Sequence, residues 1–162
     1  MTETWRLLMS EESKATSETM NKLKEKVSET MNKLKEKVSE DLKINKDDLK
    51  SETEKNGIKY HYYLGLFISE KRDLSRLDTL QKKKYKLLYH KLKFKNEYRL
   101  KTGTELNTYI DADEQMAKLN NLIRNSKHSI EYLDKVLDLF KMRGFAIKNM
   151  IDIIKLEAGG FY

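Results

Sequence analysis

The fold is decided by residues 116–154, which read MAKLNNLIRNSKHSIEYLDKVLDLFKMRGFAIKNMIDII. Steps of alternately three and four residues through this stretch meet ten apolar residues at twelve positions. The positions are Met116, Leu119, Ile123, Ser126, Ile130, Leu133, Leu137, Phe140, Gly144, Ile147, Ile151 and Ile154. A repeat of 3.5 residues sustained over this length is typical of a coiled-coil helix. We expect one helix that begins with Asp111 as its N-cap, uses Glu114 as the reciprocal partner and ends before Gly159-Gly160.

The apolar surface of this expected helix widens from about Tyr132 onward, where Val136, Leu139 and Met150 flank the seam. A two-stranded coil needs only the seam, so a wider face needs a neighbour on both sides. Two structures satisfy this need, a ring of identical helices and a buried helix in a monomeric bundle, and the pattern does not separate them. The oligomerisation hypothesis has these candidate residues: Ile130, Leu133, Val136, Leu137, Leu139, Phe140, Ile147, Met150, Ile151 and Ile154.

The composition of the 162-residue chain suits long helices. Charged residues make up 36% of it and apolar residues 38%, with no Pro and no Cys. We therefore expect an all-α fold of long helices with a C-terminal coiled-coil-like helix. The absence of Cys excludes disulfides and thiolate metal sites. No apolar run is long enough to span a membrane, so a membrane partner is not expected.

The N-terminal part contains an identical tandem repeat, because residues 17–27 and 28–38 both read SETMNKLKEKV. The repeat keeps one apolar helical stripe, so it lengthens a helix rather than adding a site. Three regions follow from these patterns: a helical extension over residues 1–43, a basic helical DNA-binding region over 44–104, and an oligomerisation helix over 105–162.

Local breaks subdivide the middle of the chain. Residues 44–48 read INKDD and predict a break with a helix cap, and Asn56-Gly57 predicts a second break. Residues 58–100 read mostly as helix. Thr102-Gly103-Thr104 indicates a turn, and residues 105–110 read as a linker or short extended piece.

The basic charge of the chain is concentrated in one place. Residues 71–101 hold twelve Lys or Arg and three acids, and residues 79–96 hold no acid at all. Lysines displace counterions from phosphates, and interleaved aromatic rings stack on unpaired bases, so this stretch predicts sequence-independent binding of single strands. The candidate DNA-binding residues are Lys82, Lys83, Lys84, Lys86, Tyr89, His90, Lys91, Lys93 and Lys95. The alternative is a structural coiled-coil scaffold whose lysine face is solvated or binds acidic protein partners.

No pattern in the chain indicates an enzyme. It lacks GxxxxGK[ST], GxSxG and HExxH, and His61, His90 and His128 stand far apart without ligand spacing. The acidic run at residues 111–114 is explained by helix capping and the helix dipole. Neither a metal nor a cofactor is expected.

Three stretches resemble the UvsY family of phage recombination mediators. The most specific is Met142–Asn149, MRGFAIKN, followed by Leu156–Gly159, LEAG. Residues 109–114, YIDADE, are similar to the segment before the family's last helix, and residues 44–95 are similar to its basic first half. The likeness covers roughly residues 34–160, and the residues before it look like an extension.

The resemblance implies a non-enzymatic accessory protein of homologous recombination in the cytoplasm of an infected bacterial host. Its partners would be single-stranded DNA, a RecA-like recombinase, a single-strand-binding protein, and copies of itself in a ring of about six or seven subunits. Basic residues of the first-half helix would contact DNA, with Lys91 nearest a family contact position and Tyr89 where a basic residue would be expected. Arg143 and Phe145 would be candidates for contact with the recombinase.

Overall fold

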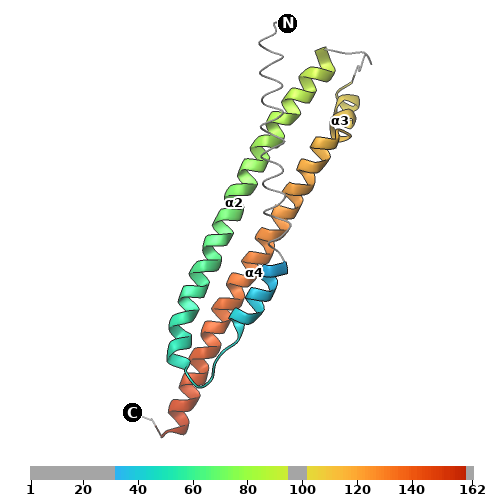
Figure 1. The fold of residues 1–162 in the computed structure, drawn as a ribbon. Helices are drawn as coiled ribbons and strands as arrows, with labels where there is room; N and C mark the ends of the chain where they lie inside the picture. The colour runs from blue at the N-terminus through green and yellow to red at the C-terminus, as the bar shows by residue number, and fades with distance from the viewer. Residues whose placement is uncertain (1–31, 95–101, 160–162) are drawn as a thin grey trace. The chain divides into compact units, whose positions relative to one another are not determined.

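The computed structural model describes residues 32–94 and 102–159, which fall into two compact units. Within the described residues, unit 1 comprises 72–94 and 102–127, and unit 2 comprises 32–71 and 128–159. All of the regular structure in these ranges is helical, which confirms the predicted all-α class (Figure 1).

Four helical segments make up the described chain. A helix over residues 32–42 precedes α2 (Leu49–Phe94), α3 (Gly103–Asp111) and α4 (Glu114–Glu157). The two long helices, α2 and α4, each contribute to both units. Within the described ranges, no helix combines the length and the apolar character that crossing a bilayer requires.

The predicted break at residues 44–48 is confirmed. The chain leaves the first helix after residue 42 and re-enters helix at Leu49. Asp48 caps α2, because its carboxylate accepts a hydrogen bond from the backbone N–H of Ser51 at 3.1 Å.

The predicted break at Asn56-Gly57 is wrong, because α2 runs through it without interruption. The amide of Asn56 is used by α4 instead of by a turn. Its Nδ2 donates to the Phe140 carbonyl at 3.2 Å, and its Oδ1 accepts from Arg143 at 3.0 Å. These long-range hydrogen bonds override the turn preference of the Asn-Gly pair.

The boundary predictions around Asp111 are also wrong. Residues 105–110 are not a linker but belong to α3, and Asp111 is the last residue of that helix. Thr102 and Glu105 form a reciprocal capping box at its start, and Leu106 and Ile110 are buried. The cap of α4 is Asp113, whose carboxylate accepts from the Met116 N–H at 2.9 Å.

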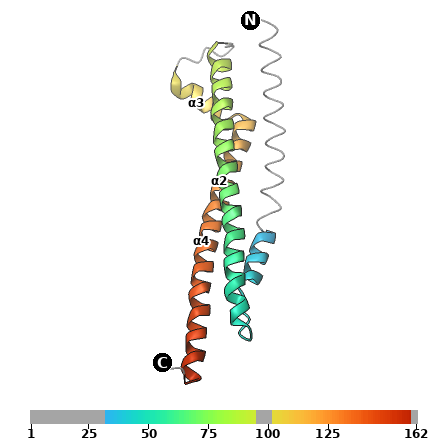
Figure 2. The same ribbon diagram turned by 90° about the vertical axis from the view of Figure 1, so that its left-hand side faces the viewer.

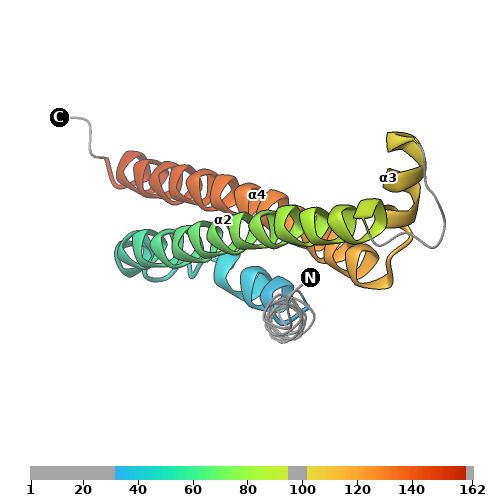
Figure 3. The same cartoon turned by 90° about the horizontal axis from the view of Figure 1, so that it is seen from above.

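Unit 2 is a packing of three helical segments around one apolar core. The segment 32–42 lies beside the N-terminal part of α2, and both pack against the C-terminal part of α4 (Figures 2 and 3). The buried core consists of Leu34, Val38, Tyr63, Leu133, Val136, Leu137 and Phe140. Two of these belong to the second copy of the tandem repeat, whose residues before 32 lie outside the described chain.

Tyr63 joins the three segments of unit 2. Its ring is fully buried and stacks on Phe140 with the ring centroids 5.0 Å apart. Its hydroxyl donates to the Asp41 carboxylate at 2.8 Å, and Lys59 donates to the Asp41 carbonyl at 2.9 Å. Burial raises the pKa of Tyr63, and the hydrogen bond to Asp41 raises it further, so the hydroxyl stays a donor.

A buried arginine links the same three segments of unit 2 at a second place. The Arg143 side chain is 2% exposed and forms an ion pair with Glu52, which is itself buried. The same guanidinium donates to the Leu42 carbonyl at 3.3 Å and to the Lys43 carbonyl at 2.9 Å. Together with the hydrogen bond to Asn56, these contacts satisfy a charge that would otherwise be costly to bury.

Unit 1 has its own small core, in which α2 packs against α4. Leu77, Leu119, Leu122 and Ile123 are buried there, and Leu74 and Leu80 pack against them. Polar contacts flank this core: Gln81 donates to Asn120 at 2.7 Å, and Tyr85 donates to Asn107 of α3 at 2.7 Å.

The predicted 3.5-residue seam of α4 faces the chain's own core over most of its length. Eight of its twelve positions are buried: Met116, Leu119, Ile123, Ser126, Leu133, Leu137, Phe140 and Ile147. The last position, Ile154, is 52% exposed. Gly159 follows the helix with a positive φ of 78°, a conformation that favours glycine and agrees with the predicted stop at this point.

Replacing Arg143 with Met should lower the free energy of unfolding by about 3–5 kcal/mol, because it leaves the buried Glu52 carboxylate with only the longer, 3.4 Å contact to the half-exposed Lys55. Urea denaturation followed by circular dichroism measures the change. The matched control is Lys141→Met, which removes an exposed pair with Asp138 and should leave the unfolding midpoint close to that of wild type. Equal midpoints for the two variants would contradict a stabilising role for the Arg143 contacts.

Acid should weaken the same contacts. Burial raises the pKa of Glu52, but the hydrogen bonds and charges of Arg143 and Lys55 outweigh burial and hold this pKa below its usual value of 4.5. The carboxylate therefore contributes stability above about pH 4.5 that is lost as the pH falls through the folded-state pKa. We expect Glu52→Gln to be less stable than wild type at pH 7 and to lose less stability on acidification. Parallel pH profiles of the unfolding midpoint would refute this.

Candidate nucleic-acid interface

The part of α2 in unit 1 carries a stripe of exposed basic residues. Starting at Arg72, steps of alternately four and three residues reach seven positions on one side of the helix. The seven are Arg72, Arg76, Thr79, Lys83, Lys86, His90 and Lys93, and all are exposed. We call these residues the basic stripe; over 21 residues of helical rise it is about 32 Å long.

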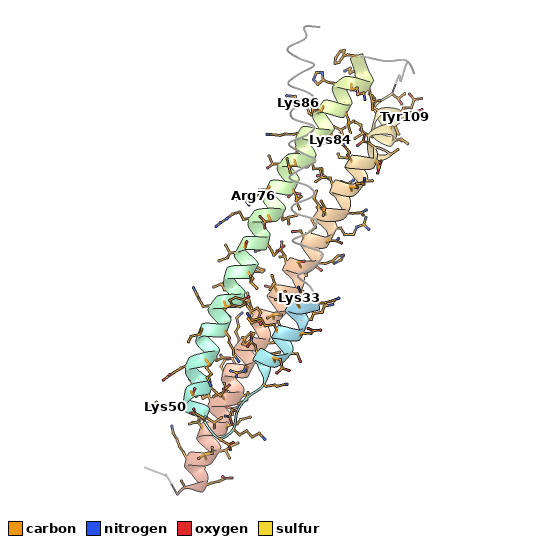
Figure 4. The ribbon with its side chains drawn as sticks, viewed as in Figure 1. Lys33, Lys50, Arg76, Lys84, Lys86 and Tyr109 are labelled. Carbon is orange, nitrogen blue, oxygen red and sulfur yellow. The ribbon has the colours of Figure 1, made fainter. Side chains whose placement is uncertain are left out.

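The basic stripe is oriented by the core of unit 1. Leu77 on the opposite side of α2 is buried against α4, so the stripe faces solvent. Figure 4 shows Arg76 and Lys86 pointing away from α4, whereas Lys84 points toward it. The stripe itself contains no acid, and Asp73 beside it is buried and pairs with Arg76 at 2.9 Å.

The sequence-predicted DNA-binding residues divide into three groups. Lys82, Lys83, Lys86, His90, Lys91 and Lys93 are exposed. Tyr89 is half-buried, and Lys84 has a side chain only 14% exposed. Lys95 lies outside the described residues.

Lys84 contacts other parts of unit 1 rather than solvent. Its ammonium group donates to the Gln115 side chain at 2.6 Å and lies 4.0 Å from the carboxylate of Asp113, the residue that caps α4. Lys84 therefore links α2 to the beginning of α4. This contact makes it a poor candidate for a phosphate ligand, in contrast to Lys83 and Lys86 on either side of it.

Two pairs of aromatic rings lie along the end of α2. The rings of Tyr85 and Tyr89 stack with centroids 6.2 Å apart, and those of His90 and Phe94 stack at 5.3 Å. Lys93 lies between the pairs, with its ammonium nitrogen 5.3 Å from the Tyr89 ring centroid and 5.7 Å from that of Phe94. The end of α2 thus combines cationic and aromatic groups, as do proteins that bind single strands.

Sequence reasoning missed Arg72 and Arg76, which extend the stripe by two turns. Both lie outside the acid-free stretch of residues 79–96. The neighbouring acids Asp73 and Asp78 lower the local net charge, so this segment did not stand out as basic. Their spacing could have identified them. Arg72 and Arg76 are four residues apart, and they precede Thr79 and Lys83, respectively, by seven residues, which places all four on one side of a helix.

The predicted oligomerisation residues also divide by burial. Leu133, Val136, Leu137, Phe140 and Ile147 are buried within the chain itself. Ile130, Met150 and Ile151 are partly exposed, and Leu139 and Ile154 are exposed. A second stripe on α4, Leu139, Met142, Ala146, Met150 and Ile153, remains open, and we call it the apolar stripe.

The apolar stripe of α4 runs into a shallow depression in unit 2. The depression has a volume of about 180 Å³ and is lined by Lys46, Leu49, Met150, Ile153 and Ile154. It is too small and too apolar to suggest a substrate site. Among residues 32–94 and 102–159, no cluster of three or more His, Asp or Glu side chains could hold a metal ion.

The two residues implicated in recombinase contact by the family resemblance lie in different environments. Arg143 is 4% exposed and its guanidinium is used within unit 2, so it offers almost no surface to a partner protein. Phe145 is 69% exposed and is open to contact.

Comparisons with known proteins agree with this architecture. Residues 37–160 match the model of a family described as "Recombination, repair and ssDNA binding protein UvsY". Among curated protein sequences, none matches the chain.

Crystal structures of the bacteriophage T4 recombination mediator protein UvsY are similar in fold. One superimposes with a TM-score of 0.71 at 25% identity, covering 79% of this chain and 97% of the T4 chain. A second crystal form gives a TM-score of 0.69 at 25% identity, over 78% and 97% of the two chains. With a family match over residues 37–160 and the same helical fold, the chain belongs to the UvsY family.

Proposed function

We propose that this protein is a recombination mediator that binds single-stranded DNA through the basic stripe of α2. The observation that carries the proposal is the exposure of all seven positions of the stripe, six of which are Lys, Arg or His. A family described by recombination, repair and single-stranded-DNA binding supports the same function.

The chemistry of the stripe favours phosphates over base edges. Lysine and arginine side chains neutralise phosphates and release counterions, which gives affinity without sequence preference. Six of the seven stripe positions are Lys, Arg or His, and none is Asn, Gln, Asp or Glu, the side chains that typically read adenine and cytosine edges. Binding should therefore be sequence-independent and strongly salt-dependent.

Self-association would raise the affinity of the basic stripe for DNA. Leu139, Met142 and Ile153 of the apolar stripe are exposed in the single chain and its other two members are partly exposed, and contiguous apolar surface of this kind is typical of interaction sites. We propose that it joins copies of the chain into a closed ring of about six or seven subunits. Repeating the basic stripe around a ring raises the effective concentration of phosphate-binding groups.

These two surfaces and the family support the biological step that we propose. The oligomer would hold single-stranded DNA inside the infected cell and help a RecA-like recombinase to replace a single-strand-binding protein. It would act by binding and presenting the strand, without catalysing a reaction. Phe145, exposed on α4, is our candidate for contact with the recombinase.

The second candidate function is a scaffold whose basic stripe binds acidic protein surfaces. The same charges would serve it, so only the preferred ligand separates the two. A scaffold would bind single strands, duplexes and acidic polypeptides alike, whereas the mediator prefers single strands.

Replacing Lys83, Lys86 and Lys93 with Ala should weaken binding of a fluorescent oligo-dT, because three phosphates would no longer be neutralised. The slope of log affinity against log salt is negative, and its magnitude should decrease by about two, at roughly 0.7 for each of these phosphates. Fluorescence anisotropy over a salt series measures both quantities.

The matched control is Lys84→Met, which removes one lysine from the same helix but from the side that contacts Gln115. It should lower the unfolding midpoint and leave the salt slope near that of wild type. An unchanged slope in the triple variant, or the same change in both variants, would contradict the proposed interface.

Replacing Met142 and Ile153 with Lys should break the oligomer, because it places charges in the apolar stripe without touching the core. Light scattering should show a fall in mass toward that of one chain, with circular dichroism unchanged. Lys148→Glu alters charge at an exposed position outside the stripe and should keep the mass. A double variant with the wild-type mass would refute the proposed surface.

A further inference from the structure

The end of α2 carries an exposed aromatic ring that phosphate binding does not require. Phe94 is 67% exposed, and its ring stacks on His90 with centroids 5.3 Å apart and an angle of 29° between the planes. Isolated exposed apolar residues are common on protein surfaces. Phe94 differs from an isolated residue because its stacking partner is a member of the basic stripe and Lys93 lies 5.7 Å from its ring centroid.

The neighbouring aromatic pair serves a different purpose. The Tyr85 hydroxyl donates to Asn107 of α3 at 2.7 Å, and the Tyr89 hydroxyl accepts from Lys93 at 3.3 Å. Tyr89 is half-buried and Tyr85 is 38% exposed. Their hydroxyls hold α3 and Lys93 in position, and both rings offer less open surface than Phe94 because they are less exposed.

We propose that His90 and Phe94 form a base-stacking subsite for an unpaired nucleobase of single-stranded DNA. The exposed face of Phe94 would receive the base, while Lys86 and Lys93 would hold the flanking phosphates. Any base has a face that can stack on an aromatic ring, so the subsite adds affinity without reading sequence.

The subsite would also explain a preference for single strands. Bases of a duplex are stacked on one another and are not free to leave the helix without an unstacking cost. The inference rests on the proposed function, because both concern the same single strand. The subsite would bind a base of the strand, and the basic stripe would bind its phosphates.

The test compares an oligo-dT with an abasic oligonucleotide of the same length, both labelled, by fluorescence anisotropy at one salt concentration. Wild type should bind oligo-dT more tightly than the abasic strand. Phe94→Leu should lose at least about fivefold in affinity for oligo-dT, the lower end of what one base–aromatic stack contributes. Its affinity for the abasic strand and its salt slope should stay at the wild-type values.

Two further variants make the test specific. Ile58→Ala is the matched control, because Ile58 is also an exposed apolar residue of α2, at 71%, but lies outside the basic stripe. It should leave both affinities unchanged. Phe94→Trp keeps an aromatic face and should retain the preference for oligo-dT, with tryptophan fluorescence quenched by oligo-dT and not by the abasic strand.

Each other outcome overturns the inference. If Phe94→Leu keeps the preference for oligo-dT, or lowers both affinities equally, the ring does not stack on a base, while the proposed function stands. If Phe94→Leu changes the oligomer mass in light scattering, the ring belongs to a subunit contact. If wild type binds neither oligonucleotide, the proposed function fails together with the subsite.

Discussion

The buried guanidinium of Arg143 constrains the arrangement of unit 2. Removing an arginine from water is tolerable only when its donors are satisfied, and here they contact Glu52, Asn56 and two carbonyls of the chain around residues 42–43. These groups come from two separate segments and the arginine comes from a third, so all three must be in place together. Gly144 permits the close approach, because a Cβ there would lie 3.1 Å from the Asn56 amide nitrogen.

The small share of each long helix that is buried in the core determines which surfaces remain for binding partners. A chain with 36% charged residues can bury only one side of each long helix, and the remaining sides must be stable in water or covered by a partner. In unit 1 the open side of α2 is basic, and in unit 2 an open side of α4 is apolar. The first surface suits a polyanion and the second suits another apolar surface, so the core and the two candidate interfaces use different sides of the same helices.

Periodicity made much of this fold predictable from the sequence. The seam of α4, the break before Leu49 and the stop near Gly159 follow from spacing and local turn chemistry. The helix through Asn56 could not be predicted, because it depends on partners 84 and 87 residues away. The sequence located the basic region but could not place Lys84, since the side of α2 that turns inward is set by packing against α4.

Affinity for DNA in such a molecule depends on more than the residues that touch DNA. If copies of the chain assemble through α4, each stripe adds to the effective concentration experienced by the others, so a substitution in α4 would weaken binding without removing a phosphate contact. The number of counterions released for each bound chain, in contrast, depends on the cationic side chains at the interface. The salt slope for each chain therefore distinguishes residues that bind phosphate from residues that support assembly, whereas affinity alone combines the two.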